Sequence, residues 1–146
     1  MSAARQSATA HAAVPHLEQL VSSLSGVVGV ILASSDGFEL GSAGDSWLAE
    51  AQLAGMSSTM QGLGEAMARN SGLDSCRDII IDSESGRIVL MSVPDVSPTM
   101  VLMAIITGQS AFGQVLLECR QCCVAISNDL GDTNTGPDAV PPERHV

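Results

Sequence analysis

Two segments of the chain are apolar at consecutive positions, and they constrain the fold more than any other feature. Residues 79–81 are three isoleucines, and residues 101–106 read Val-Leu-Met-Ala-Ile-Ile. Short apolar runs bounded by turn residues are typical of strands, and a strand that is apolar on both faces needs cover on both faces of its sheet. The sequence therefore predicts a sheet that lies between helices.

The remaining periodicity predicts the order of the elements. Leucine and valine recur every three or four residues after Pro15, which suits the first turn of a helix, and Ser34 to Gly37 form a turn signal between two apolar runs. Either Asp45 or Ser46 can cap a long second helix. We expect helices over about 15–25, 45–69 and 110–130, and strands over 27–33, 38–40, 76–82, 87–93 and 99–107. The predicted class is α/β (α+β), an α-β-β-α-β-β-β-α sandwich with a five-stranded, mostly antiparallel sheet and helices on both faces.

A chain of 146 residues is long enough for one domain with a core and too short for two. Residues 1–12 are small and polar and are expected to form a flexible arm, and residues 131–146 combine Gly, Pro and acidic residues as in a disordered tail. Residues 13–130 are the expected domain, in which residues 41–44 are interpreted as a linker.

The composition excludes several kinds of chemistry. The chain has no lysine and no tyrosine, and its three histidines are His11, His16 and His145. A phosphate-binding lysine, a Schiff base and a Ser-His-Asp site are therefore excluded or very hard to build. The net charge of −10 disfavours nucleic acid and basic membrane-binding functions. We expect neither catalysis nor a cofactor, and a role in binding other proteins.

No segment is predicted to act as a signal peptide or to insert into a membrane, so we expect a cytoplasmic protein with reduced cysteines. Cys119, Cys122 and Cys123 fall in the middle of the last predicted helix, on or beside its apolar stripe, and Cys76 lies far away in sequence. This spacing favours buried thiols over a metal or redox site.

A few single residues could carry other functions. Asp78 and Asp82 resemble a carboxylate pair, but we interpret them as solvated charges that protect a strand edge. Phe38 and Trp47 are predicted to anchor the core. An enzyme that uses Asp36, Asp78 or a cysteine such as Cys119 is a third hypothesis.

The long second helix is the most informative segment. Apolar residues at heptad spacing form one face, here called the Met seam, made of Ala49, Leu53, Met56, Met60, Leu63 and Met67. Small residues form another, here called the small face, made of Ala51, Gly55, Ser58, Gly62 and Ala66. Either both faces cover the chain's own sheet, or one of them meets a second copy; the sequence does not assign the faces.

The whole pattern resembles the Roadblock (dynein light-chain-like) family over about residues 14–130. The resemblance rests on residues 26–40 with their Ser-x-Asp-Gly turn, on the long Ala-, Gly- and Met-rich helix with the three strands that follow, and on residues 112–120. It implies one helix on one face of the sheet and two on the other. It also implies a homodimer, made by the long helix (46–69) and the third strand (76–82), that joins two sheets edge to edge. The expected interface residues are Ala49, Leu53, Gly55, Met56, Met60, Gly62, Leu63, Met67, Arg77, Ile79 and Ile81.

The resemblance further implies a function in signalling. Bacterial members of the family include regulators of Ras-like small GTPases, so we expect a non-enzymatic dimeric adaptor that scaffolds such a GTPase or modulates its GTP hydrolysis. Since family members that stimulate hydrolysis act by arranging the GTPase, no arginine finger is assigned to Arg69, Arg77, Arg87 or Arg120. The alternative is a profilin- or longin-like sensory module that binds a small ligand or a kinase.

Overall fold

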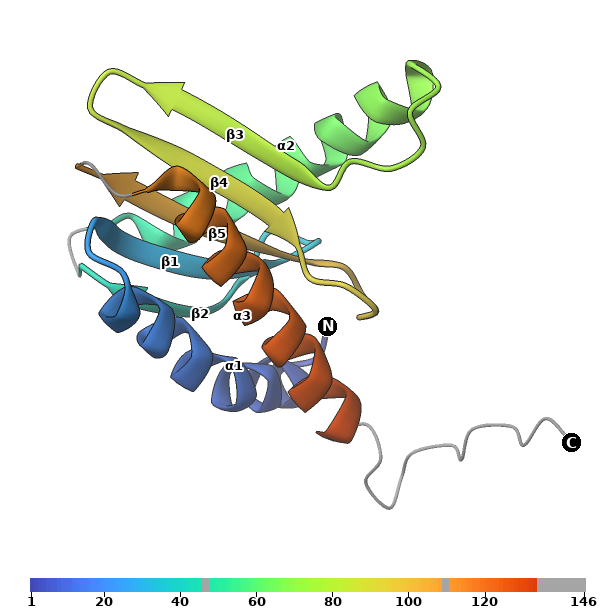
Figure 1. The fold of residues 1–146 in the computed structure, drawn as a ribbon. Coiled ribbons are helices and arrows are strands. Elements are labelled where there is room, and N and C mark those ends of the chain that lie inside the picture. Colours follow the sequence, from blue (N-terminus) through green and yellow to red (C-terminus); the bar gives the residue numbers. More distant parts are fainter. Residues whose placement is uncertain (46–47, 109–110, 134–146) are drawn as a thin grey trace, which may run out of the picture.

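The computed structural model describes residues 1–45, 48–108 and 111–133, and it has three layers (Figure 1). The strands form one sheet in the order β2-β1-β5-β4-β3, and every neighbouring pair is antiparallel. The elements are α1 (Ala3–Ser23), β1 (Val27–Ser34), β2 (Glu39–Gly44), α2 (Glu50–Asn70), β3 (Asp78–Ser83), β4 (Gly86–Ser92), β5 (Met100–Thr107) and α3 (Phe112–Thr133). The predicted sandwich with helices on both faces is confirmed.

Two hydrophobic clusters lie on opposite faces of this sheet, which explains why the strands are apolar without alternation. Leu102 and its alternate neighbours pack under α1 and α3, while Val101 and Met103 pack under α2. The three central strands β1, β4 and β5 therefore contribute consecutive residues to two different cores. The expected distribution of two helices on one face and one on the other is observed.

The first helix is longer than expected, because residues 3–12 belong to α1 instead of forming an arm. The Ser2 side chain caps the helix by accepting a hydrogen bond from the backbone N–H of Arg5, and Thr9 and Ala13 are buried. Pro15 lies inside the helix, not in its first turn. A run of small residues resembles a loop in sequence, yet it allows this helix to lie close to the sheet.

Residues 41–44 were interpreted as a linker, but they belong to β2. A Cβ atom on Gly41 would lie 3.1 Å from Cγ2 of Val14 in α1, so the missing side chain lets the helix approach the strand closely. The backbone N–H of Asp45 donates to the carbonyl of Val28 and extends this pairing. The second helix consequently begins only at Glu50, after Ala49, which provides no side-chain cap.

The predicted aromatic anchors are not part of the described core. Phe38 is 54% exposed in the turn between β1 and β2, where the Ser34 side chain accepts a hydrogen bond from its backbone N–H. The neighbouring Gly37 has a φ of 88°, which favours glycine, as the Asp-Gly signal predicts. Trp47, the proposed cap Ser46, Ser110 and the tail from residue 134 lie outside the described residues.

Candidate functional site: the open side of α2 and β3

The side of α2 that faces the sheet belongs to neither of the two predicted faces. It carries Ala54, Ser57 and Gln61, which are buried. One alanine and two polar residues do not indicate a buried face in the sequence. The Gln61 amide donates to the Ser92 hydroxyl of β4 and so fixes the helix to the sheet. Gln61 is not recognisable from the sequence as a buried contact, because a polar residue at this spacing carries no hydrophobic signal.

The Met seam is divided between the chain's own core and its surface. Leu53 and Met60 pack partly against the cluster under α2, whereas Met56, Leu63 and Met67 are 55%, 56% and 70% exposed. Ala49 is exposed just before the first turn of the helix. Each of these three large apolar residues is therefore more than half exposed and available for contact with another protein.

The glycines of α2 differ in their surroundings. A Cβ added to Gly55 or Gly62 meets no atom within 4 Å, but one added to Gly64 would lie 2.8 Å from Cδ1 of Ile79 and 3.0 Å from Sγ of Cys76. Gly64 thus allows α2 to lie against the chain's own β3. The small face holds no close contact of this kind at Gly62.

This difference predicts opposite responses to a single methyl group. Gly62→Ala is expected to stabilise the fold by about 1 kcal/mol, since glycine is unfavourable inside a helix and the site is open. Gly64→Ala is expected to be at least about 1 kcal/mol less favourable than Gly62→Ala, because its methyl group overpacks Ile79. Urea unfolding of both variants measures the difference, and equal effects would contradict the assignment.

Strand β3 forms one edge of the sheet. Ile79 packs partly under α2, while Ile80 and Ile81 are 47% and 37% exposed. Arg77 is exposed immediately before the strand. An exposed apolar edge strand presents unpaired backbone groups to another chain, and soluble proteins rarely leave one uncovered.

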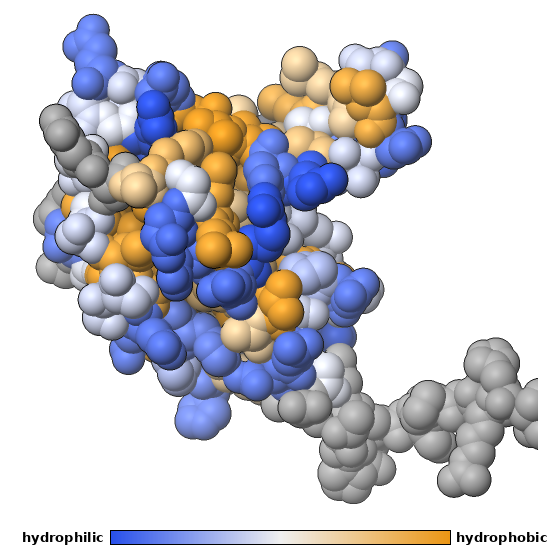
Figure 2. Space-filling view, in the orientation of Figure 1, coloured by the Kyte–Doolittle hydropathy of each residue, from blue (hydrophilic) through white to orange (hydrophobic). Residues whose placement is uncertain are grey.

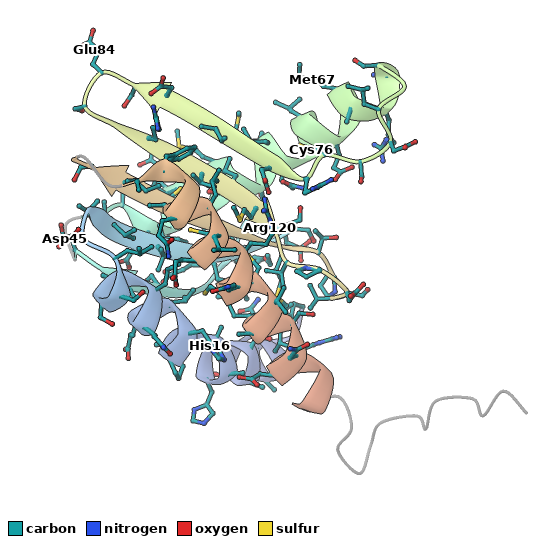
Figure 3. The ribbon with its side chains drawn as sticks, viewed as in Figure 1. His16, Asp45, Met67, Cys76, Glu84 and Arg120 are labelled. Atoms are coloured by element: carbon teal, nitrogen blue, oxygen red, sulfur yellow. The ribbon has the colours of Figure 1, made fainter. Side chains whose placement is uncertain are left out.

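Between this edge strand and α2 lies an apolar groove of about 660 Å³. Its walls include Leu53, Met56 and Met60 of α2 and Ile81, Ile88 and Met103 of the sheet. The C-terminal end of α2 projects beyond the sheet, past the N-terminal end of β3 and away from this groove (Figures 1 and 3). Figure 2, which faces the α3 side of the sheet, shows apolar residues near β3 and β4 and on the projecting end of the helix.

We call the exposed apolar set on these two elements and the loop between them the α2–β3 surface. It comprises Met56, Leu63, Met67, Leu73, Ile80 and Ile81. These account for most of the large apolar side chains that are exposed among the described residues. Exposed apolar side chains gathered on neighbouring elements are typical of interaction sites.

The carboxylates of β3, which the sequence predicts to be solvated, both pair with arginines, and only Asp82 is largely exposed, at 73% of its side chain. Asp78 accepts a 2.8 Å hydrogen bond from Nη2 of Arg120 in α3, and its side chain is only 21% exposed. Asp82 forms a 3.3 Å contact with Nε of Arg87, whose guanidinium also lies 4.5 Å from the ring centroid of Phe112. Asp78 and Arg120 are 42 residues apart, so no local sequence signal could have paired them.

The cysteines of α3 are buried free thiols, as predicted. Burial raises the pKa of Cys119 to about 12 and that of Cys122 to about 11, and it also raises the pKa of Cys123. Thiols with such pKa values are not nucleophiles at neutral pH. Among the described residues, no three His, Cys, Asp or Glu side chains come close enough to hold a metal ion.

Comparison with known proteins identifies the family. The family model for the Roadblock/LC7 domain matches residues 15–107, from the middle of α1 to the end of β5. The chain belongs to the Roadblock/LC7 family. No curated protein matches its sequence significantly.

Solved structures share the Roadblock/LC7 fold at low sequence identity. The gliding protein MglB from Thermus thermophilus is 16% identical with a TM-score of 0.73, over 86% of this chain and 93% of that one. Myxococcus xanthus MglB is 14% identical with a TM-score of 0.71, over 90% and 94%. A Roadblock/LC7 domain from Streptomyces avermitilis is 14% identical with a TM-score of 0.71, over 80% and 95%. In the described part of this chain, no helix is long and apolar enough to cross a membrane.

Proposed function

We propose that the protein is a non-enzymatic homodimeric adaptor that binds a Ras-like small GTPase and holds it in place or modulates its GTP hydrolysis. The observation that carries this proposal is the α2–β3 surface, which combines exposed apolar side chains with the edge of a sheet. Family membership supports the same conclusion, because bacterial Roadblock proteins include regulators of such GTPases.

The shape of the α2–β3 surface favours a second copy as its first partner. Pairing two β3 edges around a two-fold axis would join two sheets and bring each groove beside the other copy's α2. Gly64 contacts Ile79 near one end of β3, while the groove lies beside Ile81 at the other end. A two-fold axis through the middle of β3 exchanges these ends, so Leu63 and Met67 of one copy would enter the groove of the other.

This arrangement assigns the dimer contact to the Met seam and β3, and leaves the small face outside it. Interfaces of permanent dimers resemble a divided core, and methionine adapts to irregular gaps. One structural neighbour, 16% identical with a TM-score of 0.74, is described as MglB with a tetrameric arrangement, which supports self-association in this fold.

The chemistry of the chain supports a binding function. In the described part, the three cysteines of α3 are buried, the histidines lie on α1, and the two aspartates of β3 pair with arginines. The sensory alternative would require an enclosed cavity with converging polar groups. The groove beside α2 is instead lined by half-exposed apolar side chains such as Met56, which suits a protein partner better.

The test uses the full chain and a Ras-like small GTPase encoded in the same genome. The dimer is expected to bind that GTPase with a dissociation constant that differs by at least about tenfold between the forms loaded with GDP and with a non-hydrolysable GTP analogue, as a nucleotide-state sensor requires. Isothermal titration calorimetry measures both constants. Absence of binding to either form would contradict the proposed partner, while leaving the dimer intact.

A further inference from the structure

The hairpin that contains β3 determines which backbone groups face the open edge. Ser83 and Gly86 are paired across a two-residue turn, and such flanking residues exchange both backbone hydrogen bonds. Hydrogen-bonded and non-hydrogen-bonded pairs alternate along an antiparallel ladder. The backbone N–H and C=O groups of Ile81 and Ile79 therefore also bond to β4. The N–H and C=O groups of Asp78, Ile80 and Asp82 therefore point away from β4, toward any strand that extends the sheet.

A two-fold axis restricts how two copies of β3 can pair. In an antiparallel pair of identical strands the axis passes between two directly opposite residues, so one residue lies opposite its own copy. With most of the strand paired, that central residue is Ile79, Ile80 or Ile81. All three registers pair the outward-facing backbone groups of the two copies. The choice between the registers therefore depends on the side chains.

The side chains favour Ile80 at the centre. In this register each Ile79 lies opposite Ile81 of the second copy, and every isoleucine faces an isoleucine. A centre at Ile79 would place Ile81 opposite Arg77, and a centre at Ile81 would place Ile79 opposite Ser83. Cross-strand apolar pairs stabilise a sheet, whereas an apolar residue opposite a charge does not.

The register centred on Ile80 also brings carboxylates of the two copies opposite each other, which disfavours it. It places Asp78 of each copy directly opposite Asp82 of the other, on the face of the sheet that α3 covers, and like charges at opposite positions are destabilising. Both carboxylates already have an arginine partner within their own chain, Arg120 for Asp78 and Arg87 for Asp82. Each end of the strand pair then holds two carboxylates together with two guanidiniums, so its net charge is zero.

We propose that two copies pair through β3 with Ile80 opposite Ile80, and that Arg120 and Arg87 allow this register by neutralising the facing Asp78 and Asp82. This inference rests on the dimer of the proposed function and goes beyond it by naming the register and the residues that permit it. Arg120 and Arg87 are thus positioning residues of the interface. Each pairs with an aspartate of its own chain and acts on the second copy through that aspartate.

Disulfide trapping tests the register. In a Cys76→Ser background, which removes the partly exposed cysteine, Ile79→Cys and Ile81→Cys are made separately. Ile79 and Ile81 occupy non-hydrogen-bonded positions at the edge, where opposite Cα atoms lie about 4.5 Å apart, within the range of a disulfide. Under mild oxidation neither variant is expected to cross-link alone, but an equal mixture is expected to give covalent dimers.

Other outcomes of this experiment are equally clear. Cross-linking of Ile79→Cys alone would move the centre to Ile79, cross-linking of Ile81→Cys alone would move it to Ile81, and either overturns the proposal. Absence of every cross-link while light scattering still shows dimers would exclude β3 pairing. A monomeric unsubstituted chain would instead refute the dimer of the proposed function itself.

A rescue experiment tests the arginine. Arg120→Gln is expected to weaken dimerisation by about tenfold at low salt, because Asp78 and Asp82 then face each other with one guanidinium missing. Adding Asp78→Asn to Arg120→Gln is expected to restore the dimer to within about threefold of the unsubstituted chain. An unchanged dissociation constant for Arg120→Gln, or a double variant no better than the single one, would contradict the role of Arg120.

Discussion

Replacing Leu63 and Met67 with glutamate is expected to convert the dimer into a folded monomer. Both side chains are more than half exposed on α2, so the substitutions remove little from the chain's own core. In the proposed dimer they enter the apolar groove of the second copy, where a carboxylate would lose its water without gaining a partner. We expect the dissociation constant of the dimer to rise by about 100-fold or more, as for two central interface residues.

A matched control separates this effect from that of added charge. Phe38 in the β1–β2 turn is 54% exposed, and Gln19 is exposed on α1, which packs near β2 at the opposite edge of the sheet. Phe38→Glu with Gln19→Glu adds the same charge and is expected to leave the dimer unchanged. Sedimentation velocity over a range of concentrations measures both variants, and a double variant at Leu63 and Met67 that remains dimeric would exclude the Met seam as the contact.

The second large effect is a loss of stability at alkaline pH, caused by the buried thiols of α3. Cys119 and Cys122 have pKa values of about 12 and about 11 in the folded chain, above the ordinary value of 9.0. The unfolded state therefore loses these protons first as the pH rises. Stability is fully present below about pH 9 and falls above it, by about 1.4 kcal/mol per pH unit for each such thiol until the folded pKa is reached.

The composition makes this experiment unusually direct. The chain has neither lysine nor tyrosine, the side chains that normally titrate between pH 9 and pH 12. Urea unfolding at pH 7.5 and at pH 10.5 is expected to show a large drop in the free energy of unfolding. Cys122→Ala is expected to reduce this drop by roughly 2 kcal/mol, the effect of one thiol over that interval. An equal drop in both proteins would show that Cys122 ionises as readily in the folded state as in the unfolded one.

The sequence allowed most of the fold to be predicted, because its strongest signals are apolar runs that must be buried. The run over 101–106 became the central strand β5, and the turn at Gly37 formed as expected. Residues 3–12 and 41–44 were misinterpreted for one shared reason. Their small residues carry no hydrophobic period, and their structure depends on contacts that only the folded chain reveals, such as that of Arg5 with Ser97 and that of Gly41 with α1.

The candidate site was predictable only in part. The heptad spacing identified the residues of the Met seam, but not that Leu53 and Met60 turn inward while Leu63 and Met67 stay exposed. That division depends on the rotation of α2 about its axis, which places Ala54 and Gln61 against the sheet. Long-range ion pairs such as that of Asp78 with Arg120 likewise leave no trace at any sequence spacing.

The molar mass of the unsubstituted chain in solution is the most direct test of this account. Light scattering behind a gel-filtration column, at low micromolar concentration and moderate salt, is expected to give twice the chain mass of 15.0 kDa. A mass of 15.0 kDa under these conditions would mean that the exposed α2–β3 surface does not associate with itself, and would contradict the proposed adaptor.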